Sequence, residues 1–84
     1  MYEIETKIRK FLAENFILSE QADQLGVSDS FLEKGIIDST GILELVFFVE
    51  DQFSVQIDTS EVLPENFDSI ENLASYIRRK LGSG

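Results

Sequence analysis

The pattern of apolar and polar residues along the chain predicts helices. In three segments the apolar side chains recur every third or fourth residue, which puts them on one face of a helix. We expect these helices over residues 3–16, 39–53 and 69–81. Their inward-facing stripes are Ile4, Ile8, Phe11 and Leu12; Ile42, Leu45, Val46, Val49 and Phe53; and Ile70, Leu73, Ala74, Ile77 and Leu81. No segment competes as a strand, in which apolar and polar positions alternate.

Cap signals mark where the predicted helices begin. A short helical turn is predicted around residues 60–63, opened by the sequence DTS and ended by Pro64. Asp38 is a good N-cap for the second long helix. Asp68, with a Glu three residues later, resembles a capping box at the start of the last helix. We therefore expect an all-α fold, a small four-helix bundle of three long helices and one short helix.

Residues 17–38 lose the helical period and form a connection that is long for a compact domain. We expect this connection to be ordered, because it holds enough apolar side chains to pack against the core. Those side chains are Leu18, Leu25, Val27, Phe31, Leu32, Ile36 and Ile37. The chain length of 84 residues indicates one domain over residues 1–84, with residues 82–84 as a flexible tail.

Composition narrows the function classes. The chain contains neither Cys nor His, so it lacks a thiol and the side chain that most often acts as a general base near neutral pH. We expect no catalytic activity and no metal site. The absence of Cys, of a signal-peptide pattern and of a 20-residue apolar run predicts a cytoplasmic protein.

The charge is strongly acidic and unevenly distributed. The chain has sixteen acidic and seven basic residues, for a formal net charge of −9. Between residues 17 and 71, Lys34 is the only base. Such a surface repels nucleic acid and anionic membrane and attracts basic protein surfaces. We expect a monomer that binds protein partners, and neither nucleic acid nor membrane.

Three Asp-Ser pairs compete as a site of chemistry, and their serines are Ser30, Ser39 and Ser69. Ser69 flanks a predicted helix cap, and Ser30 lies in a turn-like SDS sequence, so both are expected to make local hydrogen bonds. Ser39 would be the first residue of a helix, where free N–H groups and the helix dipole favour an attached phosphate. Gly35 allows a positive φ before the Asp38-Ser39 corner, which would leave it exposed. Ser39 is therefore the candidate modification site.

An apolar patch follows Ser39 along the predicted helix. Leu43 and Phe47 lie one and two turns further on, off the centre of the core stripe. Three acids surround them: Glu44, Glu50 and Asp51. An apolar patch with an acidic rim is typical of a protein-docking surface. The alternative is that Leu43 and Phe47 pack beneath the long connection, because helical stripes in small bundles are often wide.

The chain resembles acyl carrier and peptidyl carrier proteins over residues 28–57, SDSFLEKGIIDSTGILELVFFVEDQFSVQI. The matching features are Phe31, Gly35, the Asp38-Ser39 pair, the helix that follows and Ile57. The predicted flanking helices match the family in length and order, so the resemblance covers nearly the whole chain.

The resemblance implies a cofactor and its partners. A phosphopantetheinyl transferase, using coenzyme A and magnesium, would attach 4′-phosphopantetheine to Ser39, and the arm's thiol would hold an acyl or aminoacyl group as a thioester. Asp38 would position the site and help to bind the metal during modification. Leu43, Glu44 and Phe47 fall where carrier proteins touch partner enzymes.

Departures from the family's pattern bear on the cargo. Thr40 follows the serine where Leu is common, and Gln52 replaces a usual acid. Gly41 and Ile42 stand where fatty-acid carriers have acidic and hydroxyl residues. A glycine two residues after the serine, as at Gly41, is similar to the pattern of D-alanyl carrier proteins. These departures favour a specialised biosynthetic pathway with loading by an AMP-forming acyl or aminoacyl ligase, followed by acyl-transferring enzymes. A short cargo near solvent is expected, because a dense core offers no large pocket.

Three other functions compete with this interpretation. One is a housekeeping carrier of fatty-acid synthesis, and another is a cofactor-free acidic adaptor that binds a basic protein. The third is a calcium loop of twelve residues starting at Asp29. Phe31 would occupy a ligand position, Lys34 the position that requires Gly, and Thr40 the position of the bidentate Glu, so the calcium loop fails.

Overall fold

The computed structural model describes residues 3–38 and 40–82. Met1, Tyr2, Ser39, Ser83 and Gly84 lie outside the described residues, as does the larger part of the predicted tail. The described elements are α1 (Glu3–Asn15), α2 (Ser19–Gln24), α3 (Gly41–Phe53), the 3-10 turn η1 (Thr59–Glu61), α4 (Pro64–Phe67) and α5 (Ile70–Gly82). The all-α prediction is confirmed, with two short helices where one was expected.

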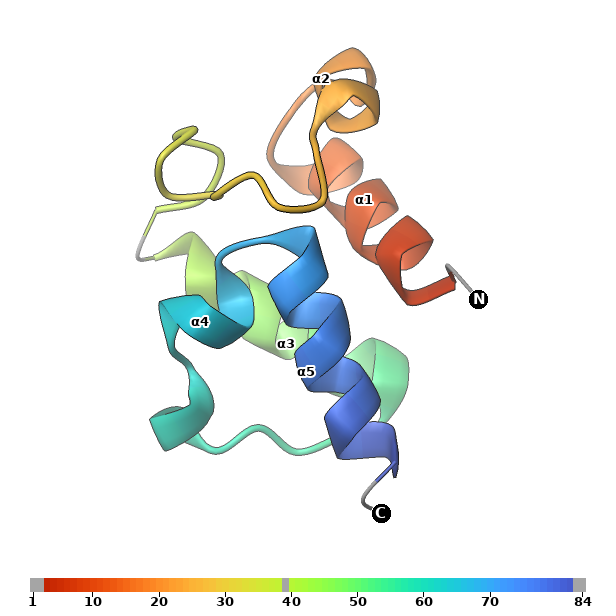
Figure 1. Ribbon diagram of the computed structural model, residues 1–84, viewed down its shortest axis with the longest axis vertical. Coiled ribbons are helices and arrows are strands. Elements are labelled where there is room, and N and C mark those ends of the chain that lie inside the picture. The colour runs from red at the N-terminus through yellow and green to blue at the C-terminus, as the bar shows by residue number, and fades with distance from the viewer. Residues whose placement is uncertain (1–2, 39, 83–84) are drawn as a thin grey trace.

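The long helix α5 is the centre of the arrangement. It runs down the middle of Figure 1 with α3 behind it, and α1 and α4 lie on its two sides. α5 contacts α1, α3 and α4, and α2 packs on α1 at the top of the view. The core between these helices is made by fourteen buried apolar residues: Ile8, Leu12, Leu25, Phe31, Ile37, Leu45, Val46, Val49, Phe67, Ile70, Leu73, Ala74, Tyr76 and Ile77.

The three predicted long helices are present, with small differences at their ends. α3 begins at Gly41 and not at residue 39, within the usual variation of helix boundaries. The sequence predicts that Leu81 faces the core, but Leu81 is exposed. Ile77 is the last residue of α5 that belongs to the buried core. Gly82, the first residue of the predicted tail, is the final residue of α5, and the flexibility of the tail stays a prediction.

The long connection contains α2, which the periodicity did not reveal. Its sequence SEQADQ is only six residues long and buries only Ala22, so no apolar stripe can form. Arg9 of α1 donates to the backbone carbonyls of Ala22 and Leu25 and ties the end of α2 to α1. Of the seven apolar residues expected to pack there, three are buried and Ile36 is partly buried. The other three, Leu18, Val27 and Leu32, are exposed, contrary to prediction.

Asp68 joins the long connection to the junction of α4 and α5. Its carboxylate accepts hydrogen bonds from the Ser30 hydroxyl and from the Leu32 N–H at 2.9 Å. Its backbone carbonyl accepts from the Phe31 N–H at 2.8 Å. The predicted local bond of Ser30 is present, since its oxygen accepts from the Glu33 N–H at 3.1 Å, but the bond to Asp68 adds a long-range role that the sequence did not predict.

The caps around α4 and α5 also differ from prediction. Ser69 is buried, and its hydroxyl oxygen accepts from the Asn72 N–H at 3.0 Å, so Ser69 caps α5 and the Asp68 capping box is wrong. Asp58 opens η1 as the DTS signal predicts, by accepting from the Ser60 N–H at 2.9 Å. Pro64 does not simply end that turn, because it is the first residue of α4, a position that proline favours.

Candidate functional site

The candidate site is the corner where α3 begins. Ser39 itself lies outside the described residues, so its neighbours define the corner. Oδ1 of Asp38 accepts from the Gly41 N–H at 2.8 Å, and the Asp38 carbonyl accepts from the Ile42 N–H at 3.2 Å. These are N-cap bonds, so Asp38 caps the turn that leads into α3, as predicted, whereas Thr40, which directly precedes Gly41, makes no side-chain cap bond. Asp38 and Thr40 are both exposed.

Two glycines shape this corner for different reasons. Gly35 has a φ of +70°, the left-handed conformation that favours glycine, and there is open space where its side chain would stand. At Gly41 the reason is close packing. A Cβ there would lie 2.9 Å from Cγ2 of Ile37 and 3.1 Å from Cε1 of Phe16. Packing therefore accounts for the glycine at position 41, without any requirement from the cargo.

The outward face of α3 carries the predicted apolar patch. Leu43 is 57% exposed and Phe47 is 66% exposed, so neither packs beneath the long connection. Glu44 and Asp51 are also exposed. Glu50 is half-buried, and its carboxylate accepts from the Ile57 N–H at 3.0 Å, which gives it a structural role. That any of these five residues binds a partner stays a prediction.

The structure adds α1 residues to this patch. Phe11 stacks on Phe48 with ring centroids 4.1 Å apart, and both are half-buried. Together with Phe47 they line a shallow hollow of about 460 Å³ between α1 and α3. Asn15, Glu44 and Asp51 complete its wall. The sequence placed Phe11 on the core stripe of its own helix, and no local pattern indicates that it would meet an exposed residue of α3.

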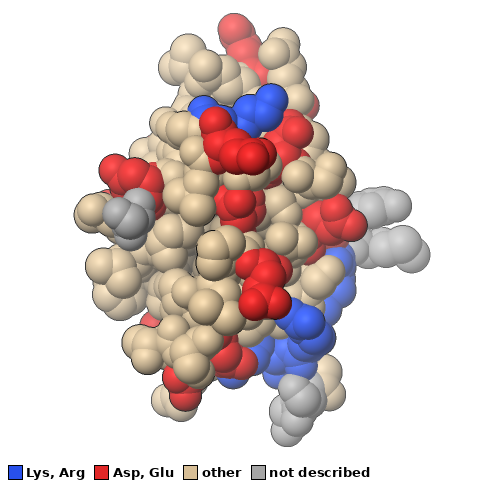
Figure 2. Space-filling model, turned by 60° about the vertical axis from the view of Figure 1, so that its left-hand side comes forward, with Lys and Arg blue, Asp and Glu red and all other residues tan. Residues whose placement is uncertain are grey.

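Charges are arranged unequally around the molecule. Acidic side chains are spread over the face drawn in Figure 2, whereas basic ones gather at its top and lower right. Near the end of α5, the Glu61 carboxylate accepts from Lys80 Nζ at 3.1 Å and from the Tyr76 hydroxyl at 3.0 Å. These two bonds lower the pKa of Glu61, whereas burial and the bond to Glu61 raise the pKa of Tyr76 to about 12. This cluster joins η1 to α5.

The core has little empty space beside the start of α3. A cavity of about 70 Å³ lies between the long connection, α3 and α4, and Leu32, Ile42, Val62, Leu63, Pro64, Phe67 and Asp68 line it. At about 30 Å³ for a water molecule in the liquid, this cavity has room for about two waters. In this conformation it cannot take a long acyl chain.

Within residues 3–38 and 40–82, no helix is long and apolar enough to cross a membrane. In the same residues, no three His, Cys, Asp or Glu side chains group so that they could hold a metal ion.

Comparisons with known proteins agree with this fold. No family model matches the chain. It is 31% identical over 77 residues to aminoacyl carrier protein 2 of Bradyrhizobium diazoefficiens, covering 92% of this chain and 81% of that one. It is 29% identical over 76 residues to the probable acyl carrier protein PigG of a Serratia species, covering 90% and 86%.

A solved structure has the same fold. The solution NMR structure of a holo acyl carrier protein from Nitrosomonas europaea matches with a TM-score of 0.80 at 24% identity, covering 98% of this chain and 99% of the other. Sequence relatives and fold therefore lead to the same conclusion. The chain belongs to the acyl carrier protein family, so it is a carrier with a covalently attached 4′-phosphopantetheine and not an enzyme.

Proposed function

We propose that Ser39 carries the 4′-phosphopantetheine and that the chain presents acyl or aminoacyl groups to partner enzymes of a specialised biosynthetic pathway. The observation that supports this site is the capped start of α3. Asp38 holds the helix end through Gly41, and the exposed residues on either side of Ser39 leave the corner accessible. The start of a thirteen-residue helix favours a phosphate there. The residues of the corner therefore fit the group.

The serines of the other two Asp-Ser pairs have structural roles. The Ser69 hydroxyl caps α5 and is only 3% exposed. The Ser30 hydroxyl donates to the Asp68 carboxylate. Modification of either one would remove a hydrogen bond that holds the junction of α4 and α5, whereas at the Ser39 corner Asp38 accepts the N–H of Gly41.

Asp38 and the patch on α3 have separate tasks in this proposal. Asp38 positions the corner for a phosphopantetheinyl transferase. Because it directly precedes Ser39, its carboxylate can help to bind the magnesium that the transferase uses. Leu43 and Phe47 supply apolar contact with partner enzymes, and Glu44 and Asp51 attract their basic surfaces. Glu50 belongs to the same rim, although its bond to the Ile57 N–H leaves it less available. When bound, the arm supplies the thiol that holds the cargo as a thioester.

We infer a short acyl or aminoacyl cargo, loaded by an AMP-forming ligase and consumed by acyl-transferring enzymes. The cavity of about 70 Å³ beside Ile42 supports a short cargo, since a long chain would have to displace core side chains. The names of the Bradyrhizobium and Serratia relatives are compatible with such a role. The glycine at position 41 lends no support, because packing against Phe16 and Ile37 already requires it.

The site is tested by intact-mass measurement after co-expression with a phosphopantetheinyl transferase. The wild-type chain should gain the mass of one phosphopantetheine, and Ser39→Ala should lose that gain completely. Ser30→Ala and Ser69→Ala are matched controls from the other Asp-Ser pairs and should keep it. A retained mass gain in Ser39→Ala would show that another residue is modified.

The cargo is tested by loading the holo protein with acyl groups of increasing length and following amide chemical shifts. For a short cargo near solvent, changes should stay around the start of α3 at every length. Progressive shifts at Ile42, Val46 and Val62 as the chain lengthens would mean that the core opens around it. That result would favour the housekeeping fatty-acid carrier instead.

A further inference from the structure

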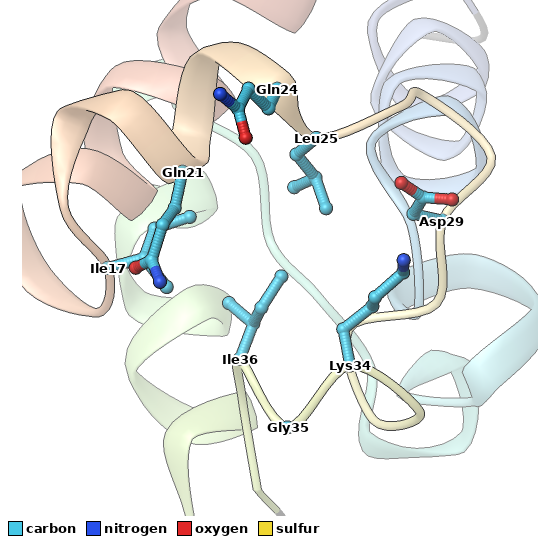
Figure 3. A pocket seen from close by; sticks show the side chains of 8 residues that line it. All are labelled: Ile17, Gln21, Gln24, Leu25, Asp29, Lys34, Gly35 and Ile36. Carbon is cyan, nitrogen blue, oxygen red and sulfur yellow. The ribbon is translucent and has the colours of Figure 1, made fainter.

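A second hollow lies on the other side of the corner, between α2 and the residues that lead into α3. Its volume is about 420 Å³. It is lined by three apolar side chains, two carboxamides and an ammonium group: Ile17, Leu25, Ile36, Gln21, Gln24 and Lys34. Figure 3 shows these side chains arranged around one open space, with Leu25 and Ile36 pointing toward each other. Neither the carrier function nor the patch on α3 uses this hollow.

The hollow adjoins the start of α3 on two sides. Phe16, which precedes Ile17, approaches Gly41 so closely that a Cβ there would lie 3.1 Å from its ring. Ile37, which follows Ile36, would lie 2.9 Å from the same Cβ. Two residues of the wall, Ile17 and Ile36, are thus chain neighbours of the two side chains that pack on the helix start. Ser39 is also only three residues after Ile36, so a flexible group attached there is within reach of the hollow.

We propose that this hollow holds the pantetheine part of the arm while the carrier is free of partner enzymes. The inference rests on Ser39 as the attachment site. Its volume falls within the roughly 300–1,000 Å³ of small-molecule sites, which combine apolar walls with a few polar groups. Pantetheine alternates apolar carbons with two amides. Ile17, Leu25 and Ile36 suit the carbons. The Gln24 carboxamide can donate to and accept from the amides, whereas Gln21, whose oxygen already accepts from the Leu18 N–H at 3.1 Å, offers its NH₂ group as a donor.

Lys34 gives the hollow the charge that a phosphodiester requires. It is the only base between residues 17 and 71, and it is part of this wall. Asp29, the acid of the same wall, accepts a hydrogen bond from the Gly26 N–H at 2.8 Å and so holds a turn. In an acidic stretch that repels phosphate, the single cation is thus part of the hollow proposed for the arm.

Because the arm is attached to the protein, weak binding is enough to hold it in the hollow. A tethered group experiences an effective concentration in the millimolar range for short flexible linkers, so the hollow needs only modest affinity to be occupied. The same weakness leaves the arm available to a partner enzyme. The hollow would thus keep the arm near the protein surface without competing strongly with a partner's active site.

The experiment compares the apo protein with the holo protein made with a transferase and coenzyme A, by mass and by NMR. We expect shift changes at the side-chain NH₂ groups of Gln21 and Gln24, and NOEs from the arm's geminal methyl groups to Ile17, Leu25 or Ile36. The double variant Gln21→Ala/Gln24→Ala should keep the full mass gain and lose these NOEs. Glu20→Ala/Asp23→Ala, also on α2 but outside the wall, should keep both.

Three results would count against the proposal, and they differ. A holo protein with the full mass gain, but with shift changes confined to residues 37–42 and no NOEs to the wall, would leave the carrier function intact and exclude the hollow as the arm's site. A wild-type chain that gains no mass would overturn the modification and this inference together. NOEs that persist in Gln21→Ala/Gln24→Ala would likewise remove the two carboxamides from the proposal.

Discussion

Two helices of the same length, α3 and α5, each have an Asp-Ser pair at their start, one separated by one residue from Gly41 and the other directly before Ile70, yet the pair is used in different ways. At α3 the aspartate caps the helix, with Asp38 bonded to the N–H three residues on. At α5 the serine caps it, with Ser69 bonded to the N–H three residues on. This shift by one residue releases Asp68 to hold Ser30 and Leu32 of the long connection.

The surroundings of the two corners differ as much as their caps. The α5 corner is enclosed by the long connection and by α4, and Ser69 is buried. The α3 corner has exposed residues on both sides of Ser39. The same dipeptide thus forms a structural junction where it is covered, whereas its open copy at Asp38-Ser39 is the proposed attachment corner. The three predictions below test this contrast, from the largest expected effect to the smallest.

Two phenylalanines, one next to the α5 corner and one two turns along α3, should respond differently to replacement by Ala. Phe67, next to the α5 corner, is 1% exposed, so Phe67→Ala should lower the free energy of unfolding by about 3–5 kcal/mol. For Phe47, on the open face of α3, the change to Ala should lower the free energy of unfolding by less than about 1 kcal/mol, because folding buries little of this side chain. Urea unfolding measures both. A loss at Phe47 as large as at Phe67 would mean that Phe47 belongs to the core.

The two aspartates should also differ. Asp68→Ala removes the acceptor of two hydrogen bonds from the long connection and should cost about 2–3 kcal/mol, as bonds to a charged group do. Asp38→Ala should cost about 1 kcal/mol, the usual effect of losing an N-cap, and should slow modification by the transferase. Denaturant titration and the rate of mass gain test the pair. Equal stability losses with unchanged modification would contradict the contrast.

The charge on the open face should affect association and not folding. Glu44→Lys should leave the unfolding midpoint within experimental scatter, because Glu44 is exposed. It should slow association with a loading ligase at low ionic strength and weaken the salt dependence, since rim charges act mainly on the rate of encounter. Stopped-flow kinetics at two salt concentrations measure this, with Glu71→Lys on α5 as an exposed control. Unchanged association at low salt would remove Glu44 from the partner surface.

The long helices and the Asp38 cap could be predicted because their causes are local. The stripes of α1, α3 and α5 repeat within each helix, and the Asp38 cap acts over three residues. The resemblance to carrier proteins rests on the same short segment, so the family could be predicted too. The exposure of Leu43 and Phe47 followed from their position beside the α3 stripe.

Tertiary structure decided what depends on residues far apart in the chain. Asp68 meets Ser30 across 38 positions, which turns an apparent helix cap into a tie between segments. Phe16 and Ile37 close on Gly41, which explains a glycine that the sequence attributed to the cargo. Likewise Leu18, Val27 and Leu32 have the composition of core residues, but the path of the connection over the surface leaves them exposed. Local periodicity and cap chemistry carry no information on which distant side chain fills a given space, so these features follow from packing alone.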